Sequence, residues 1–275
     1  MDRPANLDDP DTPNAARLYD YYLGGAHNFA ADRRKAREVI DLWPNVVPVA
    51  QRNRAFLRRV VQSAVAAGVT QFLDLGSGVP TVGNVHEIAL ANDPDARVVY
   101  CDCEPVACAH SQLLLERRKL GDRVGVIRQD MRDPDAVLNE PEVVRLLDLD
   151  RPVCLLMVAV LHFVGPEDDP AGLVRAYRDA LPAGSWFAAS HIASDRAPAE
   201  QREQVERFAK AYATTSNALH VRDRDEFTSW FDGFELLDPG VSFLSDWRPD
   251  QPAEASDDPT EARSLAWCAV GRKLG

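Results

Sequence analysis

The spacing of apolar residues divides the chain into two parts. Over residues 14–70 apolar positions recur three and four residues apart, which is the spacing of amphipathic helices. Gly24 and Gly25 predict a helix end within this part. One face of its last predicted helix carries Asn53, Leu57, Val60, Val61 and Ala64. We therefore expect an N-terminal helical extension, or cap, over residues 14–70.

From residue 71 onward, short apolar runs alternate with longer amphipathic segments, a pattern typical of βαβ units and a parallel sheet. The predicted strands are Gln71–Leu75, Arg97–Cys101, Val124–Arg128, Val153–Val158, Trp186–Ser190, Phe234–Leu237 and Leu265–Val270. No helical pattern separates the last two, so they predict an antiparallel hairpin. The expected fold is α/β, a doubly wound, seven-stranded, mainly parallel sheet over residues 71–275 that ends in this hairpin.

Three segments lie outside the regular pattern. Residues 1–13 are acidic and contain prolines, so we expect a flexible tail. Residues 197–216 have a helical pattern and are expected to form a lid over a pocket. Residues 249–260 are acidic and rich in proline, as in an exposed loop.

Composition narrows the class of protein. The 275 residues are 45% hydrophobic and 27% charged, as in ordinary soluble domains. The formal net charge of −12 repels a phosphate backbone, so nucleic acid is not expected as a partner. Apolar runs such as Val153–Val160 are far shorter than the roughly 20 residues needed to span a bilayer, so no membrane partner is expected.

The cysteines and the N-terminus indicate a compartment. Five cysteines, an odd number, are scattered without the paired clusters of a zinc site, so we expect no metal and a reducing environment. The first residues are acidic rather than basic and apolar, unlike an export signal. The sequence predicts a cytoplasmic protein and leaves its oligomeric state open.

The strongest chemical signal is the segment Phe72–Gly78, in which an apolar strand ends in Asp74 and then turns through Gly76, Ser77 and Gly78. Glycine permits positive φ and lets the backbone approach a ligand, so this turn predicts a cofactor site at the carboxyl end of the strand. An ordinary tight turn is the alternative.

Two further predicted strands also end in acids. Asp102 ends the second strand, and a carboxylate there can accept hydrogen bonds from both hydroxyls of a ribose. After the third strand, Asp130 is expected to accept from an adenine amine while Met131 packs on the ring. The alternatives are a solvated strand-end aspartate for Asp102 and a plain loop for Asp130 and Met131.

Three successive acidic strand ends resemble the class I S-adenosylmethionine-dependent methyltransferases, which have a Rossmann-like fold with an antiparallel last strand. The resemblance implies that the cofactor is bound by the first motif Asp74–Gly78, the ribose acid Asp102, the adenine wall Asp130 and Met131, and the methionine-flanking segment Leu156–Phe163 with Ala159. It covers roughly residues 71–275.

One departure from the commonest first motif bears on the cofactor. The third glycine is missing, because Val79 and Pro80 follow Gly78 and the next glycine is Gly83. A dinucleotide pyrophosphate needs a close helix approach there, so the departure argues against NAD more than against S-adenosylmethionine, which has no phosphate.

The extension carries a longer motif. Residues 16–33 read Ala-Arg-x-Tyr-Asp-Tyr-x-Leu-Gly-Gly-x-x-Asn-Phe-x-Ala-Asp-Arg, and Gln51–Leu57 follows. Together they resemble a bacterial family of largely uncharacterised S-adenosylmethionine-dependent methyltransferases. With the core motifs, the resemblance spans almost the whole chain.

The extension also supplies candidate cofactor residues. The carboxylate of the cofactor's methionine end is best bound by a guanidinium or amide donor, so Arg17, Arg54 and Asn53 are candidates. For the two arginines, structural ion pairs are the alternative. Tyr19 and Tyr22 are expected to close the pocket over the cofactor, with a place in the core as the alternative.

His162 and His191 follow predicted strands at the same sheet edge and are the candidate general bases, with satisfied wall residues as the alternative. Methyl transfer from a sulfonium needs little more than in-line approach, and a base is needed only for a poorly acidic acceptor. The leading hypothesis is a methyltransferase that acts on a small-molecule acceptor. A non-catalytic S-adenosylmethionine- or S-adenosylhomocysteine-binding regulatory protein and an NAD-dependent oxidoreductase are the alternatives.

Overall fold

The computed structural model describes residues 10–80, 83–250 and 261–275. In these residues eight strands form one sheet in the order β3-β2-β1-β4-β5-β8-β6, and β7 also pairs with β8. The strands are β1 (Gln71–Leu75), β2 (Arg97–Asp102), β3 (Val124–Arg128), β4 (Cys154–Val158), β5 (Trp186–Ile192), β6 (Phe234–Leu236), β7 (Ser242–Phe243) and β8 (Ala266–Lys273). Strands β1 to β5 are parallel, and β8 is antiparallel to β5, β6 and β7. The α/β class and the antiparallel ending are confirmed.

The predicted count of seven strands was one too low. The missed strand, β7, has only two residues and lies between the two strands of the predicted hairpin. Two residues are too few to show the alternation that marks a strand in sequence. The expected pairing of the last two predicted strands is present as β6 against β8.

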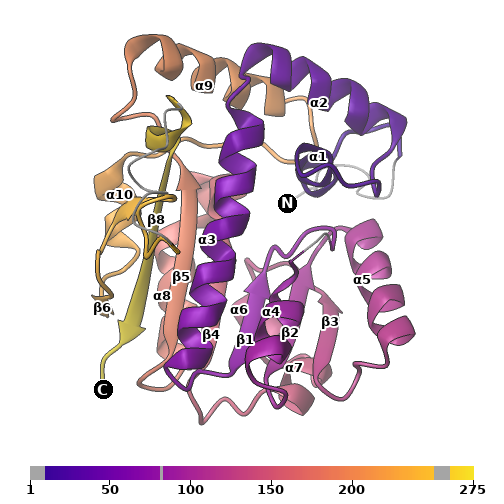
Figure 1. The fold of residues 1–275 in the computed structure, drawn as a ribbon, viewed down its shortest axis with the longest axis vertical. Helices are drawn as coiled ribbons and strands as arrows, with labels where there is room; N and C mark the ends of the chain where they lie inside the picture. Colours follow the sequence, from indigo (N-terminus) through magenta and orange to yellow (C-terminus); the bar gives the residue numbers. More distant parts are fainter. Residues whose placement is uncertain (1–9, 81–82, 251–260) are drawn as a thin grey trace.

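Helices cover both faces of the sheet and its carboxyl edge. They are α1 (Ala15–Tyr22), α2 (Ala30–Leu42), α3 (Val46–Ala66), α4 (Val85–Asn92), α5 (Pro105–Arg118), α6 (Pro134–Leu138), α7 (Pro141–Leu146), α8 (Pro170–Ala180), α9 (Ala199–Tyr212) and α10 (Arg224–Ser229). Figure 1 shows α3 along the sheet and α1, α2 and α9 beyond the carboxyl ends of the parallel strands. None of the described helices combines the length and apolar character needed to cross a membrane.

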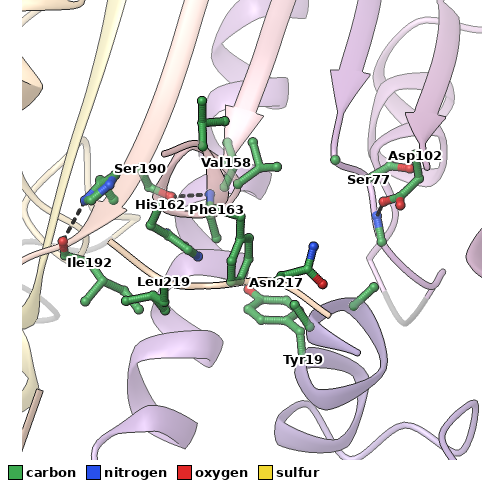
Figure 2. A pocket seen from close by; sticks show the side chains of 18 of the residues that line it. Tyr19, Ser77, Asp102, Val158, His162, Phe163, Ser190, Ile192, Asn217 and Leu219 are labelled. Atoms are coloured by element: carbon green, nitrogen blue, oxygen red, sulfur yellow. Dashed lines mark hydrogen bonds between the residues drawn. The ribbon is translucent and has the colours of Figure 1, made fainter. Parts of the chain in front are cut away.

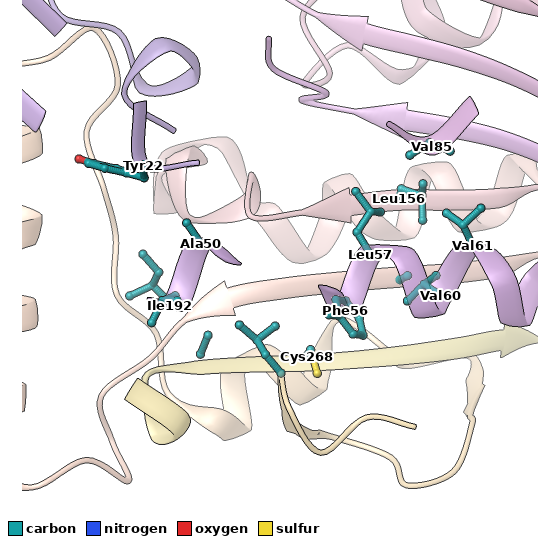
Figure 3. Packing of buried hydrophobic residues seen from close by; sticks show 14 of the residues in the cluster. Tyr22, Ala50, Phe56, Leu57, Val60, Val61, Val85, Leu156, Ile192 and Cys268 are labelled. Carbon is teal, nitrogen blue, oxygen red and sulfur yellow. The ribbon is translucent and has the colours of Figure 1, made fainter. Parts of the chain in front are cut away.

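Alternation along the strands produces two apolar cores. In β1, Phe72 belongs to one cluster of buried residues, whereas Leu73 and Leu75 belong to the other, because successive side chains point to opposite faces. On the first face, Phe56 and Val60 of α3 are fully buried in the same cluster (Figure 3). Burial on both faces explains why these strands read as continuous apolar runs.

The polar residues of the N-terminal motif build a buried junction between the extension and the sheet. Arg17 Nε donates to Asp32 Oδ2 at 2.8 Å, its Nη1 donates to Glu104 Oε1 at 2.6 Å, and its Nη2 donates to the carbonyl of Thr12 at 2.7 Å. Glu104 follows β2, so this pair ties α1 to the edge of the sheet. We call Arg17, Asp32 and Glu104 the Arg17 cluster.

A second polar centre shapes the turn after α1. Asp20 Oδ2 accepts from the backbone N–H of His27 at 2.9 Å and from Asn28 Nδ2 at 2.7 Å. A Cβ added to Gly25 would lie 1.9 Å from Asp20 Oδ1, so the second glycine of the motif leaves room for this carboxylate. Residues 1–9 of the predicted tail and residues 251–260 of the predicted loop lie outside the described residues.

Candidate functional site

A cavity of about 650 Å³ lies at the carboxyl ends of β1, β2, β4 and β5, and residues of α1, α3 and α9 also line it. The candidate residues that line it are Tyr19, Tyr22, Asn53, Arg54, Asp74, Gly76, Ser77, Gly78, Asp102, Asp130, Met131, Ala159, His162 and His191. Arg17 is the one sequence candidate that does not line it. Side chains far apart in the chain therefore surround one space.

The glycine turn after β1 fits only a residue without a side chain. Gly76 has φ +69°, and a Cβ added there would lie 2.2 Å from Val160 Cγ2. Its N–H donates to the carbonyl of Cys101 at 2.8 Å, which fastens the turn to β2. Gly78 also has positive φ, +66°. The backbone of this turn forms part of the cavity wall because no side chains stand in the way.

Asp102 is held at the end of β2 by backbone donors. Its Oδ2 accepts from the N–H of Gly78 at 2.7 Å, and its Oδ1 accepts from the N–H of Glu104 at 2.9 Å. Burial raises the pKa of Asp102, whereas these backbone N–H groups act to lower it. An ionised carboxylate has about four acceptor positions, so these backbone donors leave acceptor capacity for a ligand.

Asp74 is a buried acid that faces the same space (7% exposed). Burial raises its pKa to about 7, with nearby Arg54 lowering it and Asp102 raising it further. An acid in such a place ionises readily only when a positive group comes close.

Asp130, the acid that follows the third strand, also lines the cavity. Asp130 Oδ2 accepts from Arg132 Nη2 at 2.7 Å, and Arg132 Nη1 also donates to Asp168 at 2.7 Å. Met131 is buried, and its carbonyl accepts from the hydroxyl of Tyr177 at 2.8 Å. Asp130 thus already serves an ion pair, so its part in binding adenine stays a prediction.

A chain of hydrogen bonds joins the extension to the ends of two strands. Asn53 Nδ2 donates to Tyr19 Oη at 2.9 Å, and Ser190 Oγ donates to Asn53 Oδ1 at 2.5 Å. The N–H of Ala159 in turn donates to Ser190 Oγ at 2.9 Å. Ala159 has φ +57°, a strained conformation for a residue with a side chain, and such strain clusters at functional sites. Ser190 was not among the predicted site residues, because a buried serine inside a strand does not change the hydrophobic pattern.

The two candidate arginines have different places. Arg17 is 1% exposed and held by the Arg17 cluster, so it takes the structural alternative set out for it. Arg54 lines the cavity and affects the pKa of Asp74, so it is the guanidinium nearest to that acid among the candidates from the extension.

Comparison with known proteins supplies the family. The sequence profile of the S-adenosyl methyltransferase family matches residues 2–274. The chain belongs to this family. It is 36% identical to a DUF574 family protein from Streptomyces avermitilis, with a TM-score of 0.89 over 96% of this chain and 99% of that one. It is 37% identical to a protein from Thermobifida fusca assigned as a methyltransferase, with a TM-score of 0.88 over 99% and 98% of the two chains.

More distant structures share only the fold. An O-methyltransferase family protein from Burkholderia thailandensis is 14% identical, with a TM-score of 0.55 over 98% of this chain and 66% of that one. No curated protein sequence matches the chain. The family match establishes an S-adenosylmethionine-dependent methyltransferase, with S-adenosylmethionine as its cofactor, and leaves the methyl acceptor unidentified.

The residues of the cavity fit this cofactor. The Gly76 turn leaves space that a Cβ would fill, and Asp102 keeps acceptor positions for hydroxyl groups. No group of three or more histidine, cysteine, aspartate or glutamate side chains in the described residues is arranged to hold a metal ion.

His191 of this methyltransferase is fully engaged. Its Nδ1–H donates to the carbonyl of Ile192 at 2.6 Å, and its Nε2 accepts from Arg222 Nη1 at 3.3 Å. Burial lowers its pKa well below the usual value, with His162 and Arg222 adding to the effect. With both ring nitrogens occupied, His191 fits the alternative of a satisfied wall residue better than that of a general base.

His162, unlike His191, has a ring nitrogen without a hydrogen bond to the part of the chain that the structure describes. Burial, with a smaller contribution from Arg222, lowers its pKa to about 3, so the imidazole is neutral at physiological pH. Its Nδ1 is buried and makes no hydrogen bond to any described residue. A group with so low a pKa is a weak base, although it can still exchange a hydrogen bond with a ligand. Figure 2 shows His162 inside the cavity, on the opposite side from Asp102.

Proposed function

We propose that this protein transfers the methyl group of S-adenosylmethionine, in line, to a small molecule bound in the same cavity. The observation that carries the proposal is that one cavity of about 650 Å³ contains both the acidic strand ends and a separate aromatic region. A cavity of this size suits a cofactor and a small acceptor. The net charge of −12 further disfavours nucleic acid as the acceptor.

The proposed cofactor contacts follow the order of the strands. Asp102 accepts from the ribose hydroxyls, since its carboxylate has free acceptor positions next to the Gly78 N–H. Met131 and Asp130 form the adenine wall at the rim. The methionine end is placed beside the backbone from Gly76 to Gly78, including Ser77.

The contacts to the methionine end are completed from the extension. Arg54 is the proposed partner of the carboxylate, and Asp74 faces the ammonium group, whose positive charge favours ionisation of an acid with a pKa near 7. Tyr19 and Asn53 brace this end through their hydrogen bonds, and Ala159 lies at the end of β4 next to them.

Methyl transfer from S-adenosylmethionine requires little chemical assistance from the side chains of the protein. When bound, S-adenosylmethionine supplies a methyl group already activated on a sulfonium. The side chains hold the acceptor in line and exclude water, and the extension with α9 covers the cavity as the proposed cap and lid. Neutral His162 is placed to hold the acceptor by a hydrogen bond, so the acceptor must bring an atom that is nucleophilic without a strong base.

The proposal extends to the N-terminal motif. We propose that the motif of residues 16–33 is a family signature because its polar residues build the Arg17 cluster and the Asp20 turn.

All five cysteines are free, which favours a reducing compartment such as the cytoplasm.

The test combines binding and transfer. Calorimetry should show that S-adenosylhomocysteine binds and that NADH does not. Incubation with methyl-labelled S-adenosylmethionine and a fractionated metabolite extract should label a small molecule. Tight binding with no labelled product from any extract would favour the regulatory alternative, and absence of S-adenosylhomocysteine binding would contradict the cofactor assignment.

A further inference from the structure

Aromatic rings from three separated segments form a continuous wall on one side of the cavity. Trp43 and Phe208 have ring centroids 4.5 Å apart, Phe208 and Tyr212 4.8 Å, Tyr212 and Phe163 5.9 Å, and Phe163 and His162 4.4 Å. All five rings line the cavity. We call them the aromatic wall.

The two sides of the cavity differ in charge. The side of Asp74, Asp102 and Asp130 also carries Arg54 and Arg132. The lining residues other than these charged ones include the uncharged Tyr22, Val46, Val49, Ala50, Ile192, Leu219 and Leu244 and the imidazoles of His191 and His220. Figure 2 shows this division, with Ser77 and Asp102 on one side, His162, Ile192 and Leu219 on the other, and Tyr19 between them.

Two polar atoms of the aromatic wall lack partners. Trp43 is fully buried, and its Nε1–H donates to no described residue. His162 is 4% exposed, and its Nδ1 is likewise without a hydrogen bond among the described residues. Buried polar groups are normally satisfied, so two such atoms beside one cavity suggest that part of this wall is completed by a ligand.

We infer that the aromatic wall is the acceptor subsite and that it takes an uncharged, planar aromatic molecule bearing a hydroxyl group. The inference rests on the proposed function, because the cofactor must occupy the acidic side. Aromatic walls favour flat rings through offset and edge-to-face packing.

Charge selects against other acceptors. A carboxylate or phosphate placed against this wall would lose its hydration without gaining a charged partner. The cation next to His162 and His191 is Arg222, which is already engaged with Glu226 and with the carbonyls of Leu161 and Val164. A flexible aliphatic molecule would lose the ring packing. The hydroxyl is expected to exchange its hydrogen bond with water for one with His162.

The probe pair is 2-naphthol and 6-hydroxy-2-naphthoate, which share the ring system and the hydroxyl and differ by one carboxylate. Binding of each is measured by calorimetry at neutral pH on the full chain saturated with S-adenosylhomocysteine. We expect 2-naphthol to bind at least about tenfold more tightly, since the carboxylate must be desolvated. Equal or tighter binding of the naphthoate would overturn the inference.

Matched variants locate the binding. Leu219 lines the cavity, and its neighbour His220 donates its N–H to the carbonyl of His162 at 2.8 Å. Leu219→Trp should fill the subsite and weaken 2-naphthol binding by about tenfold or more, with less than about a twofold change for S-adenosylhomocysteine. Leu113→Trp, at an exposed position of α5, should change neither.

The remaining outcomes separate this inference from the proposed function. Leu219→Lys places a cation at the subsite and should raise naphthoate affinity relative to 2-naphthol, which gives a second readout if the tryptophan variant does not fold. Unchanged 2-naphthol binding in a folded Leu219→Trp protein would place the probe elsewhere and overturn the inference. Loss of S-adenosylhomocysteine binding in that variant would assign this side to the cofactor, whereas a wild-type protein that binds no S-adenosylhomocysteine would refute the proposed function itself.

Discussion

Replacement of Asp102 by alanine tests the centre of the cofactor assignment. The half-buried carboxylate accepts backbone hydrogen bonds from Gly78 and Glu104 and is proposed to accept two more from the ribose hydroxyls. A hydrogen bond to a charged group contributes about 1.5–3 kcal/mol, and water in the vacated space restores part of the loss. We expect Asp102→Ala to cost about 2–4 kcal/mol of cofactor binding, or about 30- to 900-fold in Kd.

The assay is calorimetric titration with S-adenosylhomocysteine. Asp102→Asn keeps the shape and one acceptor oxygen, so its loss should be intermediate. The control is Asp95→Ala, which removes an aspartate whose side chain is 81% exposed and pairs with Arg123. A surface pair of this kind contributes about 0–1 kcal/mol to stability, and it lies outside the cavity, so affinity should not change.

Stability of the variant must be measured alongside its affinity. Removing the carboxylate leaves the N–H groups of Gly78 and Glu104 without this acceptor, at a cost of about 1–3 kcal/mol each where they stay dry. Relief of a buried charge offsets part of that cost. If Asp102→Ala is folded by circular dichroism and binds S-adenosylhomocysteine with wild-type affinity, the ribose assignment is wrong.

Three further changes follow from the same site. Gly76→Ala puts a Cβ 2.2 Å from Val160 Cγ2 at φ +69°, so urea unfolding should show a loss of about 2–4 kcal/mol; an unchanged midpoint would contradict the close approach. Asp74 has a folded pKa of about 7, above the 3.8 of an ordinary aspartate, so its stabilising contribution is full below the lower value and is lost as pH rises to the higher one. At pH 8 the free energy of unfolding of Asp74→Asn, measured with urea, should therefore exceed that of wild type by up to about 4 kcal/mol. This difference should disappear near pH 4; a difference that does not vary with pH would refute the raised pKa of Asp74. His191→Ala should lower the thermal midpoint by an amount equivalent to about 2–4 kcal/mol, because it removes a fully engaged buried ring and the acceptor of an Arg222 N–H; a variant as stable as wild type would return His191 to the candidate bases.

The parts of the fold that could be predicted are those encoded locally. The strands β1 and β3 begin and end where the apolar runs do, because both faces of each strand are buried. The acids and glycines of the cofactor side were found for a similar reason, since each stands directly after a strand. The strand β7 was missed because its two residues depend on pairing with β8 rather than on their own pattern.

The parts that could not be predicted depend on contacts between distant segments. Arg17 pairs with Glu104, which lies 87 residues further along the chain. No spacing in the sequence shows whether an arginine will bind such a distant glutamate or the carboxylate of a ligand. Trp43 and Phe208 look like core residues on helical segments, and only the docking of α9 on the end of α2 brings their rings to the cavity. The proposed acceptor side therefore depends on tertiary packing, whereas the residues proposed to bind the cofactor are recognisable as strand ends in the sequence.

The ion pair between Arg17 and Glu104 has a consequence for the independence of the two parts of the chain. Glu104 lies two positions beyond Asp102, so the loop that presents the ribose acid is clamped from outside the α/β unit. Replacing Arg17 alone, as in Arg17→Met, would leave Glu104 buried without its counter-ion, at a cost of about 3–5 kcal/mol. The helical segment is thus no detachable accessory, because it holds the loop that follows Asp102 in place.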